Sequence, residues 1–126
     1  MTMKIYESSE DYLEAILMIR EKKGVVHSVD VAEELGFSKA SVSVAMKKLR
    51  ENGYISMEKD GALALLPPGQ TIAERIYERH QLLTDFFISL GIDEETAEND
   101  ACRVEHDLSD KTFDAIKKAI LARKTS

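Results

Sequence analysis

Cysteine, glutamate and histidine occur close together in the run Cys-Arg-Val-Glu-His at residues 102–106. In a helix, this spacing places a soft thiolate, a hard carboxylate and an imidazole on about one turn, which is typical of a transition-metal site. The run also fits an ordinary structural interpretation, with Cys102 as a small buried residue, Glu105 as a solvated charge and His106 near a helix C-terminus. The triplet alone leaves both interpretations open.

Further acidic and imidazole side chains lie upstream in segments that are predicted to be helical. Residues 10–17 have an amphipathic pattern, and Asp11 and Glu14 are three positions apart on a face beside its apolar stripe. His80 lies in the second half of a helical pattern over residues 70–90. Each of these residues has an ordinary explanation as a solvated or helix-end side chain. Together with the run at 102–106, they favour a metal-binding protein.

Length and composition narrow the class of protein. The chain has 126 residues, 44% hydrophobic and 32% charged, as expected for a soluble globular protein of one compact unit or two small lobes. No apolar run approaches the roughly 20 residues of a membrane span, and residues 1–18 do not resemble a signal peptide. The single cysteine cannot form an intramolecular disulfide. These features predict a cytoplasmic protein with no membrane association.

A local basic segment stands out in this acidic chain, whose formal net charge is -6. The net charge argues against a general polyanion binder, but residues 38–50 contain four basic residues and no acidic one. Residues 28–36 predict a short helix, beginning at a Ser28 cap and ending at Gly36, and Ser38 is expected to cap a second helix. This is a helix-turn-helix pattern. The side chains available to a DNA groove are Ser38, Lys39, Ser41, Ser43, Val44, Lys47 and Lys48.

The pattern changes from helix to strand after the second helix. Residues 54–58 and 62–65 are short strand-like runs, and the Asp60-Gly61 pair between them is a strong hairpin signal. A helix pair followed by a small hairpin predicts a winged helix-turn-helix. The run Pro67-Pro68-Gly69 is expected to interrupt the chain before the long helix. The predicted domains are therefore 1–69, which binds DNA, and 70–126.

The second domain is predicted to be entirely helical. After the helix over 70–90, a second helix is expected to begin at residues 93–95 and to carry residues 102–107, and Ser109 is expected to cap a third. These helices contain more apolar residues than so few helices can cover, which favours a homodimer. The alternative is that the apolar residues pack only against the DNA-binding domain. The fold class is mainly α.

The whole chain resembles the diphtheria-toxin-repressor family of metal-dependent transcriptional repressors, and its length is similar to that of the manganese transport regulator branch. The resemblance rests on matching runs along the sequence. They are Ser-Ser-Glu-Asp-Tyr-Leu-Glu at 8–14, Val-Ala-Glu-Glu-Leu at 31–35, the segment 38–53, Arg79-His80, Asn-Asp-Ala-Cys-Arg-Val-Glu-His at 99–106, and Leu-Ser-Asp at 108–110.

The resemblance implies a set of metal ligands. Asp11 and Glu14 match ligands of the manganese branch, and His80, Glu105 and His106 match ligands of both the manganese and the iron branch. Cys102 departs from the manganese branch, which has a glutamate there, and agrees with the iron branch. The iron branch has a glutamate and a histidine in its second site at the positions that Thr84 and Glu98 occupy here. This departure argues against a second site of the iron type, although the Glu98 carboxylate is still able to bind a metal.

The chemistry of these ligands limits the choice of metal. Carboxylates suit Mn(II), whereas a thiolate with two imidazoles shifts preference toward Fe(II), Co(II) or Zn(II). We expect Mn(II) or Fe(II), with Zn(II) or Co(II) able to substitute. Six ligands exceed the needs of one tetrahedral ion, so two ions per subunit are compatible with the set.

The family resemblance implies a repressor that senses Mn(II) or Fe(II), controls metal-uptake genes and binds a pseudo-palindromic double-stranded DNA operator as a homodimer. A winged-helix regulator that responds to a small organic ligand is the alternative. A metalloenzyme with Glu14 as general base is a weaker candidate, because no nucleophile-base pair or glycine-rich substrate loop accompanies the ligands. We therefore expect no enzymatic activity.

Overall fold

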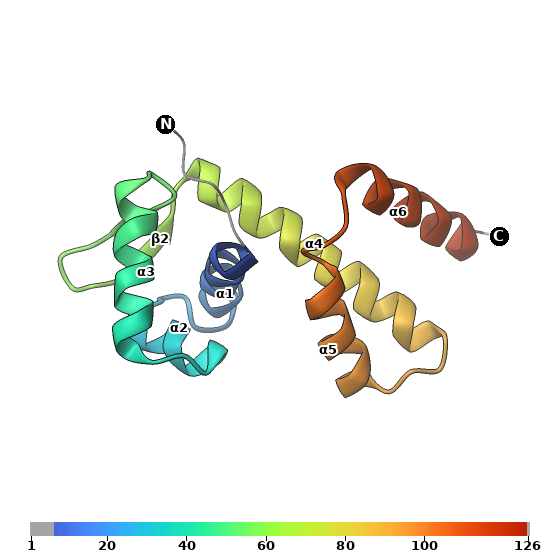
Figure 1. Ribbon diagram of the computed structural model, residues 1–126, viewed down its shortest axis with the longest axis horizontal. Helices are drawn as coiled ribbons and strands as arrows, with labels where there is room; N and C mark the ends of the chain where they lie inside the picture. Colours follow the sequence, from blue (N-terminus) through green and yellow to red (C-terminus); the bar gives the residue numbers. More distant parts are fainter. Residues whose placement is uncertain (1–6, 126) are drawn as a thin grey trace. The chain divides into compact units, whose positions relative to one another are not determined.

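The computed structural model describes residues 7–125, and these residues form two compact units. The division falls between Met1–Arg75 and Ile76–Ser126, within the long helix α4 (Pro67–Ser89), which contributes residues to both units. Figure 1 shows the helices of each unit and the hairpin of the first. In the described part of the chain, the elements are six helices and one two-stranded sheet. The predicted mainly α fold with a winged helix-turn-helix is confirmed.

The first unit contains α1 (Glu7–Lys23), α2 (Ser28–Leu35), α3 (Lys39–Glu51) and the strands β1 (Ile55–Met57) and β2 (Leu63–Leu65). Its core is apolar and draws on every one of these elements. The most deeply buried side chains include Leu13, Ile16, Val31, Val42, Met46, Leu49 and Ile55, and Leu63 of β2 is also buried. Burial of the stripe at Val42, Met46 and Leu49 fixes which face of α3 points outward. The opposite face, toward solvent, carries the predicted DNA-contacting residues.

The turn between α2 and α3 is built from local sequence signals. Gly36 has a φ of 70°, a left-handed conformation that glycine adopts at no steric cost. Ser38 caps α3, because its side chain accepts a hydrogen bond from the backbone N–H of Ser41 at 3.1 Å. The expected cap of α2 was wrong by one residue: Ser28 is its first helical residue and His27 is the cap. Asp30 completes that start by accepting a hydrogen bond from the backbone N–H of His27.

The predicted wing is an antiparallel hairpin in which Ile55 pairs with Leu65 and Met57 with Leu63. Gly61 closes its turn with a φ of 88°, and its N–H donates to the Glu58 carbonyl at 2.9 Å. Arg50 at the end of α3 donates to the Met57 sulfur at 3.2 Å. This contact joins the exposed side of α3 to the wing.

Helix α4 begins earlier than the sequence suggested. Pro67, Pro68 and Gly69 form its first turn rather than a break before it. Proline is compatible with that position because the first backbone N–H groups of a helix have no partner within the helix. Gly69 is required by packing, since a Cβ there would collide with the backbone carbonyl of Tyr54. The helix therefore starts in direct contact with the segment that leads into β1.

The second unit contains the C-terminal part of α4, α5 (Glu94–Val104) and α6 (Asp110–Thr125). Helix α4 ends in a Schellman motif: the Ile92 N–H donates to the Phe87 carbonyl at 3.2 Å, and Gly91 takes a φ of 96°. Asp93 caps α5 by accepting from Thr96, and Ser109 accepts from the Thr112 N–H at the start of α6. Within residues 7–125, no helix combines the length and the apolar character that a membrane crossing requires.

Helix α5 is shorter than predicted. It was expected to carry residues 102–107, but it ends at Val104, and residues 105–107 form a turn. Glu105 is the C-terminal cap and still has helical backbone angles, so it continues the spiral by one residue. Cys102 therefore lies on the helix, whereas His106 lies in the turn that follows it.

Candidate metal centre and nucleic-acid interface

Glu105 is the centre of a buried cluster in the second unit. Its side chain has 0% exposure, although carboxylates are rarely buried without partners. His80 on α4 brings Nδ1 to 2.9 Å from Oε2 of Glu105, and His106 brings Nε2 to 3.3 Å from Oε1. Each carboxylate oxygen thus faces an imidazole nitrogen. These three side chains offer nitrogen and oxygen donors of the kind that first-row divalent metals bind.

Opposing effects act on the Glu105 carboxyl. Burial raises its pKa, but hydrogen bonds from His106 and His80, together with the charge those rings carry when protonated, hold the pKa below its ordinary value. The carboxylate is therefore the favoured form. A negatively charged, desolvated carboxylate beside two imidazoles suits a divalent cation.

The surroundings of Cys102 and Glu105 contradict the ordinary interpretation of the run at 102–106. Cys102 is exposed on α5 rather than a small buried residue. Glu105 is fully buried rather than solvated. Exposure keeps the Cys102 thiol accessible to an ion, and Cys102 lies one helical turn before Glu105.

Asp11 and Glu14 lie in the first unit, on α1. Glu14 is 7% exposed, which excludes a simple solvated charge. Asp11 is partly exposed. It adjoins Tyr12, where burial, followed by the charge of Asp11, raises the pKa of the phenol. Leu13, Ile16 and Leu17 of α1 are buried in the core. Their burial fixes the rotation of α1 about its axis, and therefore the directions in which Asp11 and Glu14 project.

The two positions that depart from the iron branch have different surroundings. Thr84 is buried on α4, one turn after His80, and its hydroxyl has no hydrogen-bond partner among the described residues. Glu98 is exposed on α5. The hydrogen bonds and ion pairs described around the Glu105 carboxylate come from His80 and His106 instead.

Arg79 precedes His80 in the chain, and no functional role for it was predicted from the sequence. Arg79 is 4% exposed, and its guanidinium donates hydrogen bonds to the backbone carbonyls of Glu105 and Leu108 and to the Asp110 carboxylate. The signals in the sequence are its place beside a candidate ligand and its part in the Arg79-His80 pair that matches the family. Its partners lie 26 to 31 positions away, so helical spacing could not reveal them.

The predicted DNA-contacting residues all lie on the solvent-facing side of α3 or at its cap. Ser38, Lys39, Ser41, Ser43, Val44, Lys47 and Lys48 are exposed. Val44 has an exposed fraction of 57%, which leaves its apolar side chain available for contact with a partner. A groove of about 280 Å³ runs beside it, with Ser43, Lys47 and Arg50 from α3 and Met57 from the wing among its lining residues. This surface combines positive charge with a small apolar contact, as major-groove readers do.

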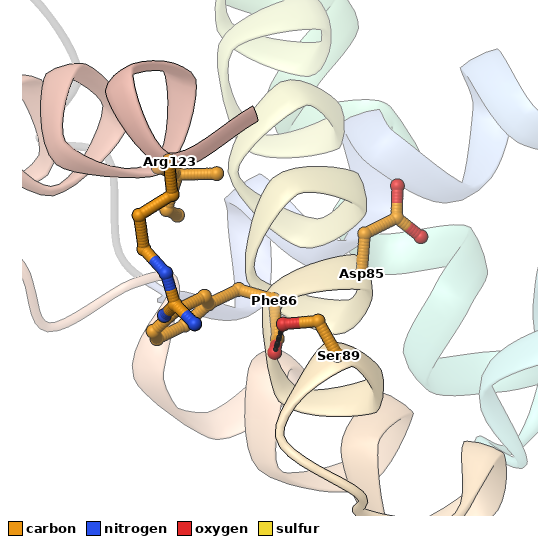
Figure 2. A pocket seen from close by; sticks show the side chains of 5 residues that line it. Asp85, Phe86, Ser89 and Arg123 are labelled. Carbon is orange, nitrogen blue, oxygen red and sulfur yellow. Dashed lines mark hydrogen bonds between the residues drawn. The ribbon is translucent and has the colours of Figure 1, made fainter. Parts of the chain in front are cut away.

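A separate cavity lies between α4 and α6 in the second unit. Figure 2 shows Asp85, Phe86, Ser89 and Arg123 around it, and its volume is about 220 Å³. The Arg123 guanidinium lies 5.5 Å from the centre of the Phe86 ring. Its described lining includes neither cysteine nor histidine, so the cavity does not resemble the cluster at Glu105.

Both units match models of one protein family. Residues 4–63 match the iron dependent repressor, N-terminal DNA binding domain, and residues 67–125 match the iron dependent repressor, metal binding and dimerisation domain. The chain belongs to the iron-dependent repressor family. The resemblance inferred from the sequence is confirmed, and the family consists of metal-dependent, DNA-binding regulators of transcription. The alternative of a regulator for a small organic ligand is not favoured.

Individual relatives agree with this assignment. The chain is similar to the HTH-type transcriptional regulator MntR of Lysinibacillus sphaericus, at 38% identity over 109 residues, which are 86% of this chain and 78% of that protein. It is 39% identical to MntR of Bacillus subtilis, with 86% of this chain and 77% of that protein covered.

Solved structures are similar as well. One is a manganese-dependent transcriptional repressor in complex with manganese, with a TM-score of 0.81 and 29% identity, covering 89% of this chain and 52% of that one. Another is the metal-dependent transcriptional regulator MtsR, with a TM-score of 0.81 and 30% identity, covering 89% and 53%. The chain thus spans about half the length of these solved chains.

Proposed function

We propose that this chain is a manganese-responsive transcriptional repressor that controls genes for metal uptake. The observation that carries the proposal is the buried Glu105 carboxylate with an imidazole at each oxygen, inside the part of the chain that matches a metal binding and dimerisation domain. The name MntR on relatives at 38–39% identity, together with the manganese complex among the similar structures, supports manganese as the signal. A cytoplasmic location fits this role, since its target is DNA.

We assign the DNA-reading function to residues 1–69 and the metal-binding and dimerisation functions to residues 70–126. The proposed ligands come from both domains: Asp11 and Glu14 from α1, and His80, Cys102, Glu105 and His106 from α4, α5 and the turn after it. A bound divalent cation would supply the positive charge that offsets the mutual repulsion of these carboxylates. Because the ligands belong to different units, occupancy of the site biases the relative placement of the DNA-reading surfaces.

The donor set makes Mn(II) the first candidate, and Fe(II) the second. Asp11, Glu14 and Glu105 are hard oxygen donors that suit Mn(II). Cys102 is the one soft donor and increases affinity for Fe(II), Zn(II) and Co(II). Six candidate ligands are enough for two ions per subunit, with Glu105 as the bridging carboxylate.

The partner that we propose is a pseudo-palindromic DNA duplex bound by a homodimer. Two copies of α3 would enter successive major grooves, and Lys39, Lys47 and Lys48 would neutralise phosphates. The side chains at Ser41, Ser43 and Val44 are short, so direct base readout is limited. Specificity would then depend strongly on half-site spacing and DNA shape.

The test is metal-activated DNA binding by the full chain. A duplex recovered by selection from a random library in the presence of Mn(II) serves as the probe, and affinity is measured by fluorescence anisotropy with Mn(II) and with chelator. His80→Ala and Glu105→Ala should abolish the Mn(II)-dependent rise in affinity, because each removes a proposed ligand. Glu95→Ala, an exposed acid in the first turn of α5 and outside the candidate ligand set, is the matched control and should leave that rise intact.

The assay also separates the proposal from its rivals. A wild-type chain that binds the duplex equally well with Mn(II) and with chelator would contradict a metal-dependent repressor. Full activation of the folded His80→Ala and Glu105→Ala proteins would contradict the ligand set. Circular dichroism of each variant establishes that the helical fold is retained.

A further inference from the structure

Arg79 connects three segments of the second unit. One guanidinium nitrogen, Nη1, donates to the Glu105 carbonyl at 3.0 Å and to the Leu108 carbonyl at 2.7 Å. A second nitrogen, Nη2, donates to the carboxylate of Asp110, the first residue of α6. The guanidinium carbon also lies 4.9 Å from the centre of the Phe113 ring. A side chain of α4 thereby holds the end of α5, the following turn and the start of α6.

The held turn is the one that carries the candidate ligands. Arg79 binds the backbone of Glu105, while the next residue, His80, contacts its side chain at 2.9 Å. Consecutive residues of α4 therefore fix Glu105 at both its carbonyl and its carboxylate. His106 lies between the two carbonyls that Arg79 binds. Its ring position consequently depends on the same hydrogen bonds.

Arginine suits this task better than any other side chain. The carbonyls at a helix C-terminus lack partners within the helix and carry partial negative charge, which a cation stabilises. The planar guanidinium stays protonated and presents several donors in fixed directions, so it can bind two carbonyls and a carboxylate together. The ammonium group of lysine is a compact point charge that cannot reproduce this arrangement.

We propose that Arg79 is the positioning residue of the metal site, holding the turn at 105–108 so that Glu105 and His106 are aligned before a metal binds. This inference rests on the proposed metal-dependent function. The competing explanation is that Arg79 only stabilises the packing of α4 against α6. The two explanations differ in what they predict for metal affinity and for the histidine rings of the metal-free protein.

The experiment compares Arg79→Met and Arg79→Lys with the wild-type full chain. Mn(II) affinity, measured by calorimetry, should fall about 10- to 100-fold in Arg79→Met, which is the usual effect of removing a group that orients a metal ligand. Arg79→Lys should lose less. The absorption spectrum of the Co(II)-loaded protein should also change, because it reports ligand arrangement rather than stability. Thermal melting of the metal-free proteins measures the purely structural effect.

Glu78→Gln is the matched control, because Glu78 also links α4 to α6, through Lys117 at 2.8 Å on the surface. It should leave Mn(II) affinity and the Co(II) spectrum unchanged. The chain has only three histidines, so their ring resonances can be followed in the metal-free protein by NMR. Those of His80 and His106 should shift in Arg79→Lys and not in Glu78→Gln.

The outcomes separate this inference from the proposed function. Wild-type Mn(II) affinity and histidine spectra in a folded Arg79→Lys protein would overturn the positioning role, even if the melting temperature falls. Equal losses of affinity in Glu78→Gln and Arg79→Lys would overturn it too. If the wild type binds no Mn(II), the proposed function fails, while the histidine spectra of the metal-free variants still decide whether Arg79 positions Glu105 and His106. Arg79→Lys also supplies the decisive result if Arg79→Met does not fold.

Discussion

A buried carboxylate is costly unless neighbouring groups stabilise its charge, and Glu105 has such neighbours at each oxygen. His80 and His106 face the two carboxylate oxygens of Glu105, and Arg79 donates a hydrogen bond to the backbone carbonyl of Glu105. Removing one partner of such a cluster leaves the others buried without compensation. The stability of the cluster should therefore be sensitive to single substitutions. A bound cation would also compensate the buried negative charge of Glu105.

This environment marks the limit of sequence-based inference at the residue scale. The types and spacing of Cys102, Glu105 and His106 indicated metal chemistry because those features are local. The burial of Glu105 and the role of Arg79 depend on contacts across 25 to 31 positions, which neither spacing nor composition encodes. Residue types and the family resemblance both placed His80 in one candidate set with the run at 102–106, but neither indicated that its ring contacts the Glu105 carboxylate.

Cys102 determines metal preference in our proposal. Cys102→Glu replaces the only soft donor with a hard one, so we expect activation of DNA binding to shift toward Mn(II) and away from Fe(II) and Zn(II). The measurement is DNA affinity against the concentration of each ion under anaerobic conditions. An unchanged order of activation would show that Cys102 does not bind the metal. Cys102→Ser, with a smaller oxygen donor, tests whether removal of sulfur alone alters the order.

At the scale of elements, local signals predicted most of the helix-turn-helix and its wing. The conformational effects of Gly36, Ser38 and the Asp60-Gly61 turn extend over only a few neighbouring residues. All of them occupy the expected positions in the structure. The start of α4 was predicted too late. Proline is compatible both with the first turn of a helix and with a break in the chain, so composition alone does not distinguish the two. The Tyr54 carbonyl leaves no room for a Cβ at Gly69, and this tertiary contact could not be read from the local sequence.

Gly69→Ala should destabilise the fold, although a glycine-to-alanine substitution in a helix usually stabilises it. Inside a helix, replacing glycine with alanine normally stabilises the fold, because alanine loses less backbone entropy. Here the added Cβ meets the Tyr54 backbone, so we expect a decrease of about 1–3 kcal/mol in the free energy of unfolding. Urea unfolding of the metal-free chain measures it. A stabilised Gly69→Ala protein would show that the packing between α4 and the segment before β1 is not tight.

The exposed face of α3 allows charge and sequence readout to be separated. Lys47→Ala should weaken binding to all duplexes and reduce the slope of log affinity against log salt by about 0.9 for each phosphate that is no longer neutralised. Val44→Ala should change the preference among operator variants at a nearly constant slope, because the role that we propose for Val44 is an uncharged apolar contact with a thymine methyl. Affinities across a salt series and a set of single-base variants measure both effects. The opposite division, with Lys47 altering preference and Val44 altering the slope, would contradict these roles.

At the scale of the whole molecule, charge is distributed unevenly. The chain has a net charge of -6, yet residues 38–50 carry four basic residues without an acidic one. The acidic net charge disfavours non-specific DNA binding, so affinity depends on how well the basic face of α3 is presented to the duplex. In our proposal, metal controls DNA binding by changing how this face of α3 is presented. The sequence indicated two lobes, whereas the coupling between them that we propose is a property of the assembled chain with metal bound.

Metal should stabilise the wild-type chain by an amount that increases with the logarithm of its affinity for the folded state. At a Mn(II) concentration about 100 times the dissociation constant, linkage gives about 2.7 kcal/mol of added stability, which appears as a rise in melting temperature. Ligands from both units contribute in our proposal, so Glu14→Gln should reduce the rise although it leaves the second unit unaltered. Glu33→Gln, an exposed acid in the same unit, is the control and should retain the full rise. Differential scanning calorimetry at matched Mn(II) concentrations measures the effect. Equal shifts in wild type and Glu14→Gln would mean that Glu14 does not bind the metal, and metal could not then couple the two units through this residue.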